Sequence, residues 1–139
     1  MNGFAASRAP RGALERLALV RKFVACWPDT VPGELNHWIS CHALAAVLEE
    51  FVSGTRRVDG HFLKRGYEHS WLVLPAHPSW VLDPYPIADV SGPVLRSVEF
   101  PSPWHDAYVP RNLPRLDTRA LAKQIATLHA CVLVGGVRP

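Results

Sequence analysis

Two apolar runs separated by a proline-rich bend constrain the fold of this chain more than any other feature. They are residues 68–74, Glu-His-Ser-Trp-Leu-Val-Leu, and residues 79–84, Ser-Trp-Val-Leu-Asp-Pro. The bend, residues 74–78, contains two prolines, which suit a turn better than the interior of a β-ladder. The runs therefore predict an antiparallel hairpin.

The most natural register of this hairpin aligns a histidine with an aspartate. Three pairs face each other in it: His69 with Asp83, Trp71 with Val81, and Leu72 with Trp80. A carboxylate across from an imidazole fixes the tautomer and orientation of the ring, as the third member of a catalytic triad does. The register therefore predicts an oriented histidine on one face of the hairpin.

The two faces of the hairpin differ in character because successive side chains of a strand point to opposite sides. Trp71 and Val81 share the face of His69 and Asp83 and supply an apolar wall beside them. The other face carries Leu72, Leu74, Trp80 and Leu82, which are expected to pack into the core.

A cysteine stands at the head of a predicted helix. Residues 41–52 are rich in alanine and leucine, Ser53-Gly54 form an exit, and either Ser40 or Asn36 is available as N-cap. A helix N-terminus and a nearby protonated histidine both lower a thiol pKa by stabilising the thiolate. We therefore expect Cys41 to be a nucleophile, with His69 as general base and acid and Asp83 orienting His69; the alternative is an inert core cysteine.

The remaining elements give the fold class. Residues 12–27 form an amphipathic pattern with Leu14, Leu17, Val20 and Phe23 on one side, and residues 117–132 form a second one that begins at Asp117. Strands are predicted at 57–63, weakened by Gly60, and at 94–100. Nine of the thirteen prolines lie between Pro75 and Pro114, so residues 101–116 are predicted to be an irregular cover. Helices before and after a run of strands predict one α+β domain over residues 1–139, its catalytic core at about 29–100, with helices packed on a small antiparallel sheet.

Composition excludes several classes of protein. Apolar residues make up 48% of the chain, which argues against extensive disorder, and the formal charge of +3 comes from arginines spread along the chain. We expect no nucleic-acid partner and no membrane span.

Three cysteines without a C-x-x-C pair argue against a disulfide framework and indicate a reducing compartment. Cytoplasmic residence is therefore expected, with signal-independent export as the alternative.

Other residues near the predicted site allow further roles. Asn36 is an oxyanion-hole candidate as well as a cap, and Trp71 and Trp104 are candidates for a substrate cleft. His37 is a rival base to His69, whereas His42 points about 100° away from Cys41 around the helix. No zinc-ligand spacing is formed by Cys41, His42, His61, His69 and His77, so no metal or other cofactor is expected. His105-Asp106 is expected at the surface, and Cys26 and Cys131 are expected to be packing residues.

The order of these residues resembles the transglutaminase-like branch of the papain-like thiol hydrolases over roughly residues 36–86. In that branch a cysteine heads a helix and is followed by a His-x-Trp-like strand and by a strand that ends in Asp-Pro or a similar pair. The matching residues here are Cys41, His69-Ser70-Trp71 and Trp80-Val81-Leu82-Asp83-Pro84. The resemblance implies a papain-like or transglutaminase-like core and acyl transfer without a cofactor. The chain lacks the Gly-Gln-Cys-Trp string of classical transglutaminases and the papain-like glutamine before the cysteine.

The sequence thus predicts a thiol-dependent enzyme acting on a peptide or protein amide. Transfer to water makes it a protease, amidase or deamidase, and transfer to an amine makes it a transglutaminase; both acceptors stay open. The first alternative is a non-catalytic domain of the same fold that binds a protein partner around Trp71 and Trp104. The second is a small metal-binding protein. Neither the substrate nor the oligomeric state follows from the residues.

Overall fold

The computed structural model describes residues 8–25, 40–63, 67–85, 92–113 and 118–135. Three helices surround a five-stranded antiparallel sheet whose strand order is β4-β3-β2-β1-β5. In chain order the elements are α1 (Arg11–Ala25), α2 (Cys41–Phe51), β1 (Arg56–Phe62), β2 (Tyr67–Val73), β3 (Trp80–Asp83), β4 (Val94–Ser97), β5 (Tyr108–Pro110) and α3 (Thr118–Gly135). The α+β class and the antiparallel sheet are confirmed.

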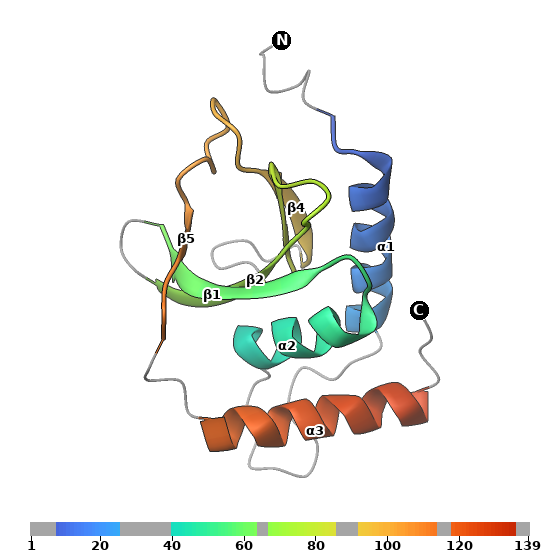
Figure 1. The fold of residues 1–139 in the computed structure, drawn as a ribbon. Helices are drawn as coiled ribbons and strands as arrows, with labels where there is room; N and C mark the ends of the chain where they lie inside the picture. Colours follow the sequence, from blue (N-terminus) through green and yellow to red (C-terminus); the bar gives the residue numbers. More distant parts are fainter. Residues whose placement is uncertain (1–7, 26–39, 64–66, 86–91, 114–117, 136–139) are drawn as a thin grey trace.

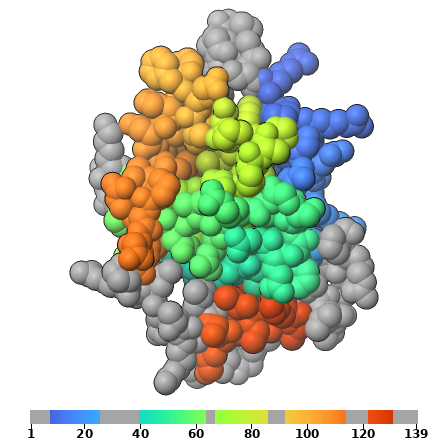
Figure 2. All heavy atoms as spheres, in the orientation of Figure 1, coloured from blue at the N-terminus to red at the C-terminus, as the bar shows by residue number. Residues whose placement is uncertain are grey.

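The helices lie on the outside of a curled sheet (Figure 1). α2 packs on β2 and β1, whereas α1 packs on β3 and β4. α3 lies on the side of α2 that faces away from the sheet, so α2 is enclosed between the sheet and α3. In the space-filling view, residues 41–63 form a band between α3 and residues 67–85, with the orange segment 92–113 at the upper left (Figure 2).

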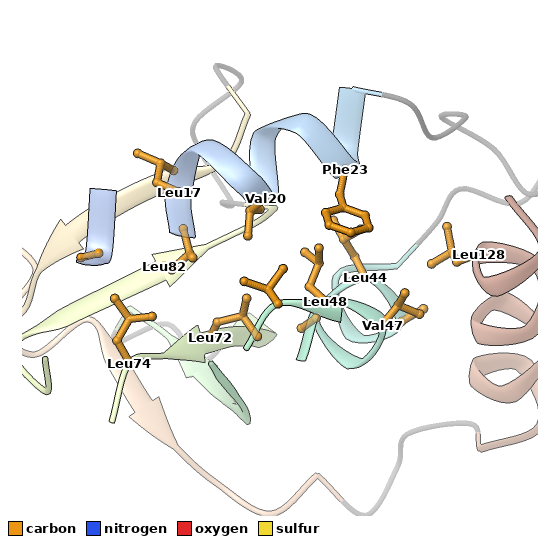
Figure 3. Packing of buried hydrophobic residues seen from close by; sticks show 14 residues of the cluster. Leu17, Val20, Phe23, Leu44, Val47, Leu48, Leu72, Leu74, Leu82 and Leu128 are labelled. Carbon is orange, nitrogen blue, oxygen red and sulfur yellow. The ribbon is translucent and has the colours of Figure 1, made fainter. Parts of the chain in front are cut away.

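The hydrophobic core lies between the helices and one face of the hairpin, as Figure 3 shows. Its buried leucines on the hairpin are those predicted from the alternation, and Trp80 packs partly buried against them. Leu14 differs from the prediction, because half of its surface is exposed on α1. The labelled members of the core are Leu17, Val20, Phe23, Leu44, Val47, Leu48, Leu72, Leu74, Leu82 and Leu128.

Ser40 caps α2 and ties its first turn to α3. Its side-chain oxygen accepts a hydrogen bond from the Ala43 N–H at 3.1 Å, which satisfies one of the donors left over at a helix start. Its own N–H donates to the Gln124 side-chain oxygen of α3 at 2.9 Å. The first turn of α2 is thereby held from two directions. Asn36, the other cap candidate, and Asp117, the predicted start of α3, lie outside the described residues.

The predicted hairpin register is wrong by two residues. Leu72 pairs with Leu82, not with Trp80, and Val73 pairs with Val81. The connection is longer than predicted because the chain turns twice, through the bonds His77 N–H to Leu74 C=O (2.8 Å) and Trp80 N–H to His77 C=O (3.0 Å). A shift of two residues keeps every side chain on its own face. His69 and Asp83 therefore remain on one face as diagonal neighbours, not as an opposed pair.

The predicted cover over residues 101–116 contains a strand that the prolines concealed. β5 pairs with the edge of β1, through Gly60 with Pro110, His61 with Val109 and Phe62 with Tyr108. Pro110 is tolerated because it ends an edge strand. A Cβ at Gly60 would meet the Val109 carbonyl oxygen and the Trp71 ring. The absence of a side chain is what allows β5 to approach.

The strand predicted at 94–100 is shorter and ends at Ser97.

Among the helices in the described part of the chain, none is long and apolar enough to cross a membrane.

Leu48→Ala tests the core. Leu48 is fully buried on α2 between the sheet and the other helices. We expect the free energy of unfolding, measured by urea denaturation, to fall by about 2–5 kcal/mol, because the cavity adds to the lost transfer energy. Leu14→Ala on α1, half exposed, is the matched control and should change it by less than about 0.5 kcal/mol. Equal effects of the two substitutions would contradict this core.

Candidate active site

The candidate site forms where the start of α2 meets the curled sheet. Cys41 and His42 are the first two residues of α2, and His69 and Ser70 are adjacent on β2. Asp83 is the last residue of β3. The order predicted from the sequence is thus brought together from three separate elements.

His69 and Asp83 form a fully buried pair, each with no exposed side-chain surface. His69 Nε2 lies 2.9 Å from both Asp83 carboxylate oxygens. Because an ionised carboxylate only accepts hydrogen bonds, Nε2 carries a proton and donates it. In the described part of the chain, His69 Nδ1 is a buried nitrogen without an ordinary hydrogen bond. The ring is therefore fixed, with Nδ1 left available for chemistry.

The Asp83 carboxylate is held by more than the histidine. The Tyr108 hydroxyl donates to Oδ2 at 2.7 Å, and the Tyr85 N–H donates to Oδ1 at 3.2 Å. Arg96 Nη1 lies 3.8 Å from Oδ2 and donates to the Tyr108 oxygen at 2.7 Å. A buried anion is tolerated when cations and donors surround it in this way. Burial and the neighbouring Asp83 charge raise the pKa of Tyr108 above its ordinary value, so this hydroxyl stays protonated as a donor.

Aromatic rings enclose the pair, and they differ from the predicted cleft. Trp71 is 1% exposed and stacks against His69 at 6.0 Å between ring centroids, so it packs the site and does not line an open surface. Trp104 is partly exposed; the Arg96 guanidinium lies 3.8 Å from its ring centroid. Phe62 contacts His69, Trp104 and Tyr108. The rings exclude water from Asp83 and strengthen its interactions with the surrounding donors.

Cys41 is partly buried and its thiol is acidic. Burial alone raises the pKa of this thiol, but hydrogen bonds and positive charge from His42 and His69 outweigh burial and lower the pKa to about 6. Since His69 Nε2 is held by Asp83, Nδ1 is the nitrogen left to face Cys41. Catalytic hydrogen bonds are often loose before substrate binds, which fits a contact that falls short of ordinary geometry.

The pKa of His69 moves in the opposite direction. Burial lowers it, but the hydrogen bond to Asp83, the interaction with Cys41 and the charges of both partners raise it to about 9. Near neutral pH the favoured state is therefore a Cys41 thiolate beside a His69 imidazolium.

His42 corrects a prediction, because it contacts the thiol that it was expected to point away from. A hydrogen bond with Cys41 is the main reason that the pKa of His42 is raised. Its Nδ1 lies 2.6 Å from the Ser70 hydroxyl.

Sequence reasoning also missed Arg96, Ser70 and Tyr108. A lone arginine within the apolar run 94–100 was the available signal for the first of these.

The other candidate residues lie away from this site or outside the description. Asn36, His37 and Cys26 are outside the described residues, and so is the side chain of Cys131. His105 Nδ1 contacts the Ser102 carbonyl and the ring packs on Phe100. Within the described ranges, no group of three or more histidine, cysteine, aspartate or glutamate side chains is placed to hold a metal ion.

Comparison with protein-family models, curated proteins and solved structures finds no match for this chain. The functional argument therefore rests on the chemistry of the site.

Asp83→Asn tests the buried pair. Without the carboxylate, the burial that lowers the His69 pKa is no longer offset by its main partner, so we expect that pKa to fall well below 9. We also expect the free energy of unfolding to fall by about 3–5 kcal/mol, because one partner of the buried His69–Asp83 pair is removed. Imidazole nitrogen shifts measured by NMR against pH report the titration. Glu50→Gln, which removes the partner of the surface His129, is the control and should leave His69 unchanged. A His69 that still titrates near 9 in Asp83→Asn contradicts this assignment.

Proposed function

We propose that this protein is a thiol-dependent acyl-transfer enzyme that acts on a peptide or protein amide. Cys41 is the nucleophile, His69 the general base and acid, and Asp83 the residue that orients His69. One observation carries the proposal: the buried His69 is held by Asp83 through Nε2, which leaves Nδ1 to Cys41 at the start of α2. A core cysteine without a function does not need an oriented, charged imidazole beside it.

The first half of the reaction forms a thioester. The Cys41 thiolate attacks the amide carbonyl carbon, a C–S bond forms, and the carbonyl electrons move to oxygen. The tetrahedral species collapses as the C–N bond breaks, and His69 Nδ1 gives its proton to the departing nitrogen. The leaving group is an amine in peptide cleavage and ammonia in deamidation. His69 is then neutral, still held by Asp83.

The second half restores the enzyme. His69 Nδ1 takes a proton from water as the water oxygen attacks the thioester carbon. The second tetrahedral species expels the Cys41 thiolate, the C–S bond breaks, and a carboxylic acid is released. An amine in place of water gives a new amide by the same steps. The thiolate and the imidazolium return together, so no external acid or base is consumed.

The start of α2 supports both tetrahedral species. The first N–H groups of a helix have no partner within the helix and carry partial positive charge, which favours a thiolate and a developing oxyanion. We assign the Cys41 backbone N–H as one oxyanion donor. Asn36 remains the candidate for a second donor.

The resemblance to transglutaminase-like and papain-like hydrolases supports the same reaction. Cys41 at a helix start, the run His69-Ser70-Trp71 and the pair Asp83-Pro84 occur in the order of that superfamily. The antiparallel sheet is compatible with a core of that kind.

Alkylation of Cys41 tests the proposal without a known substrate. In a Cys26→Ser, Cys131→Ser background, we expect the iodoacetamide rate to follow an apparent pKa near 6, because the histidines stabilise the thiolate. His69→Gln should raise that apparent pKa by about one unit or more, which is about tenfold in the ratio of thiolate to thiol. Peptide mass spectrometry measures the rate at each pH. A Cys41 that titrates near 9.0, as an ordinary thiol does, would favour the non-catalytic binding domain.

Catalysis itself is tested with a peptide library of diverse sequence. The wild-type protein should generate new termini or deamidated side chains, and Cys41→Ala should reduce their rate by about 10³-fold or more. His129→Gln, a surface substitution, is the matched control and should keep full activity. Equal product formation by the wild-type protein and Cys41→Ala would refute the assignment of Cys41.

A further inference from the structure

A second hydrogen-bonded chain starts at His42, the residue next to Cys41, and consists of residues that the proposed reaction does not use. His42 Nδ1 lies 2.6 Å from the Ser70 Oγ, and the Ser70 hydroxyl donates in turn to Asp59 Oδ1. Arg57 Nε lies 3.4 Å from the same Asp59 oxygen. The chain therefore runs from α2 across β2 to β1 and ends on a carboxylate–guanidinium pair.

The protons in this chain have one consistent arrangement. A serine hydroxyl has a single proton, and the Asp59 carboxylate can only accept, so the Ser70 proton goes to Asp59. Ser70 Oγ must then accept a proton from His42 Nδ1. With Nδ1–H fixed in this way, Nε2 is the His42 nitrogen left for Cys41. The ring is held through Nδ1, whereas His69 is held through Nε2.

The two chains lie on opposite faces of β2. Ser70 follows His69 directly, and successive residues of a strand point to opposite faces. In the β1–β2 ladder Ser70 is paired with Asp59, while His69 is paired with Gly60. His69 and Ser70 therefore belong to opposite faces of β2, and the two imidazoles that act on Cys41, His69 and His42, are held by separate sets of residues. Ser70, like His69, has no exposed surface.

We propose that His42 is a second catalytic imidazole, which holds the Cys41 thiolate through Nε2 while Ser70 and Asp59 act as its positioning residues. This inference rests on the proposed function and divides the work between the two rings. His69 moves its proton to the leaving group and back. His42 keeps both protons, because Ser70 accepts from Nδ1–H and the negative charge of Asp59 favours the cation, and it remains a fixed donor beside the sulfur throughout the cycle.

Charge around His42 fits this role. The groups that act on it are Cys41, Asp59 and His69: the first two favour its cation and His69 opposes it. The raised pKa of His42 agrees with a ring that is protonated more readily than a free histidine. Asp59 supplies the compensating negative charge through Ser70, as Asp83 does directly for His69.

Alkylation of Cys41 against pH tests the second chain, in the Cys26→Ser, Cys131→Ser background with iodoacetamide. We expect His42→Gln to raise the apparent pKa of Cys41 by about one unit, or tenfold in the ratio of thiolate to thiol. His69→Gln should leave that pKa below the ordinary 9.0, because His42 remains. Only the double variant, His42→Gln with His69→Gln, should raise the apparent pKa of Cys41 to 9.0 or above, since burial then acts on the thiol without either histidine.

Asp59→Asn and Ser70→Ala separate the positioning role from a merely structural one. Each should raise the apparent pKa of Cys41 when His42 is present and have no effect in the His42→Gln background, because contributions along one chain are not additive. Asp106→Asn, at an exposed position, and His129→Gln, near the far end of α2, are the matched controls. Ser70→Ala removes only a hydroxyl group and serves as the test if His42→Gln does not fold.

The possible failures are distinguishable. If His42→Gln leaves the pH profile of Cys41 unchanged while His69→Gln raises its pKa, the second chain is refuted and the proposed function stands. If Asp59→Asn acts equally with and without His42, Asp59 does not act through that ring and its positioning role is refuted. If Cys41 titrates near 9.0 in the unsubstituted protein, the proposed function itself fails, and the second chain fails with it.

Discussion

The buried carboxylate of Asp83 is the constraint on which the rest of the site depends. An anion with no exposed surface is sustained only by the groups around it, and here they come from four places: His69 on β2, Arg96 on β4, Tyr108 on β5 and the backbone N–H of Tyr85. These partners lie on strands distributed across the sheet, from β4 to β5. One charge therefore joins the sheet on the face opposite the hydrophobic core and holds an imidazole at a single angle. The core and the site use alternate residues of the same hairpin.

The thiol and the imidazole are coupled in a way that matters for stability. Folding lowers the pKa of Cys41 from 9.0 to about 6 and raises that of His69 from 6.5 to about 9. The Cys41 contribution to stability is complete above pH 9 and is lost as the pH falls through 6. The His69 contribution is complete below pH 6.5 and is lost as the pH rises through 9. Between about 6.5 and 9 the unfolded chain holds one proton on sulfur and the folded chain holds it on nitrogen. The pair thus carries the same number of protons in both states, and it contributes no slope to the pH dependence of stability in that range.

How far the sequence predicts this arrangement depends on which physical rule applies. The two-residue periodicity of the hairpin assigns Leu72, Leu74 and Leu82 to the core and His69 with Asp83 to the other face, and an error of two residues in register leaves those assignments intact. The shift in register changes how His69 and Asp83 meet. They are diagonal neighbours and not directly opposed, because the connection with its prolines makes two successive turns instead of one. Composition could not reveal β5, because its pairing is decided by the missing side chain of Gly60 on another strand. Arg96 and Tyr108 were missed because both contact the Asp83 carboxylate, a contact between separate strands that no local pattern indicates.

His42 shows the limit of reasoning from one element alone. On an isolated helix, residues that follow one another point about 100° apart, which separates His42 from Cys41. That rule does not by itself keep the two side chains apart at a first turn that packs on β2. There the direction of the His42 ring is set by the Ser70–Asp59 pair, a contact between α2 and the sheet. Where the start of α2 lies on β2, two adjacent strand residues bear on one sulfur: His69 acts on it directly and Ser70 acts through His42. The reactivity of Cys41 is therefore a property of where α2 crosses β2, and neither element possesses it alone.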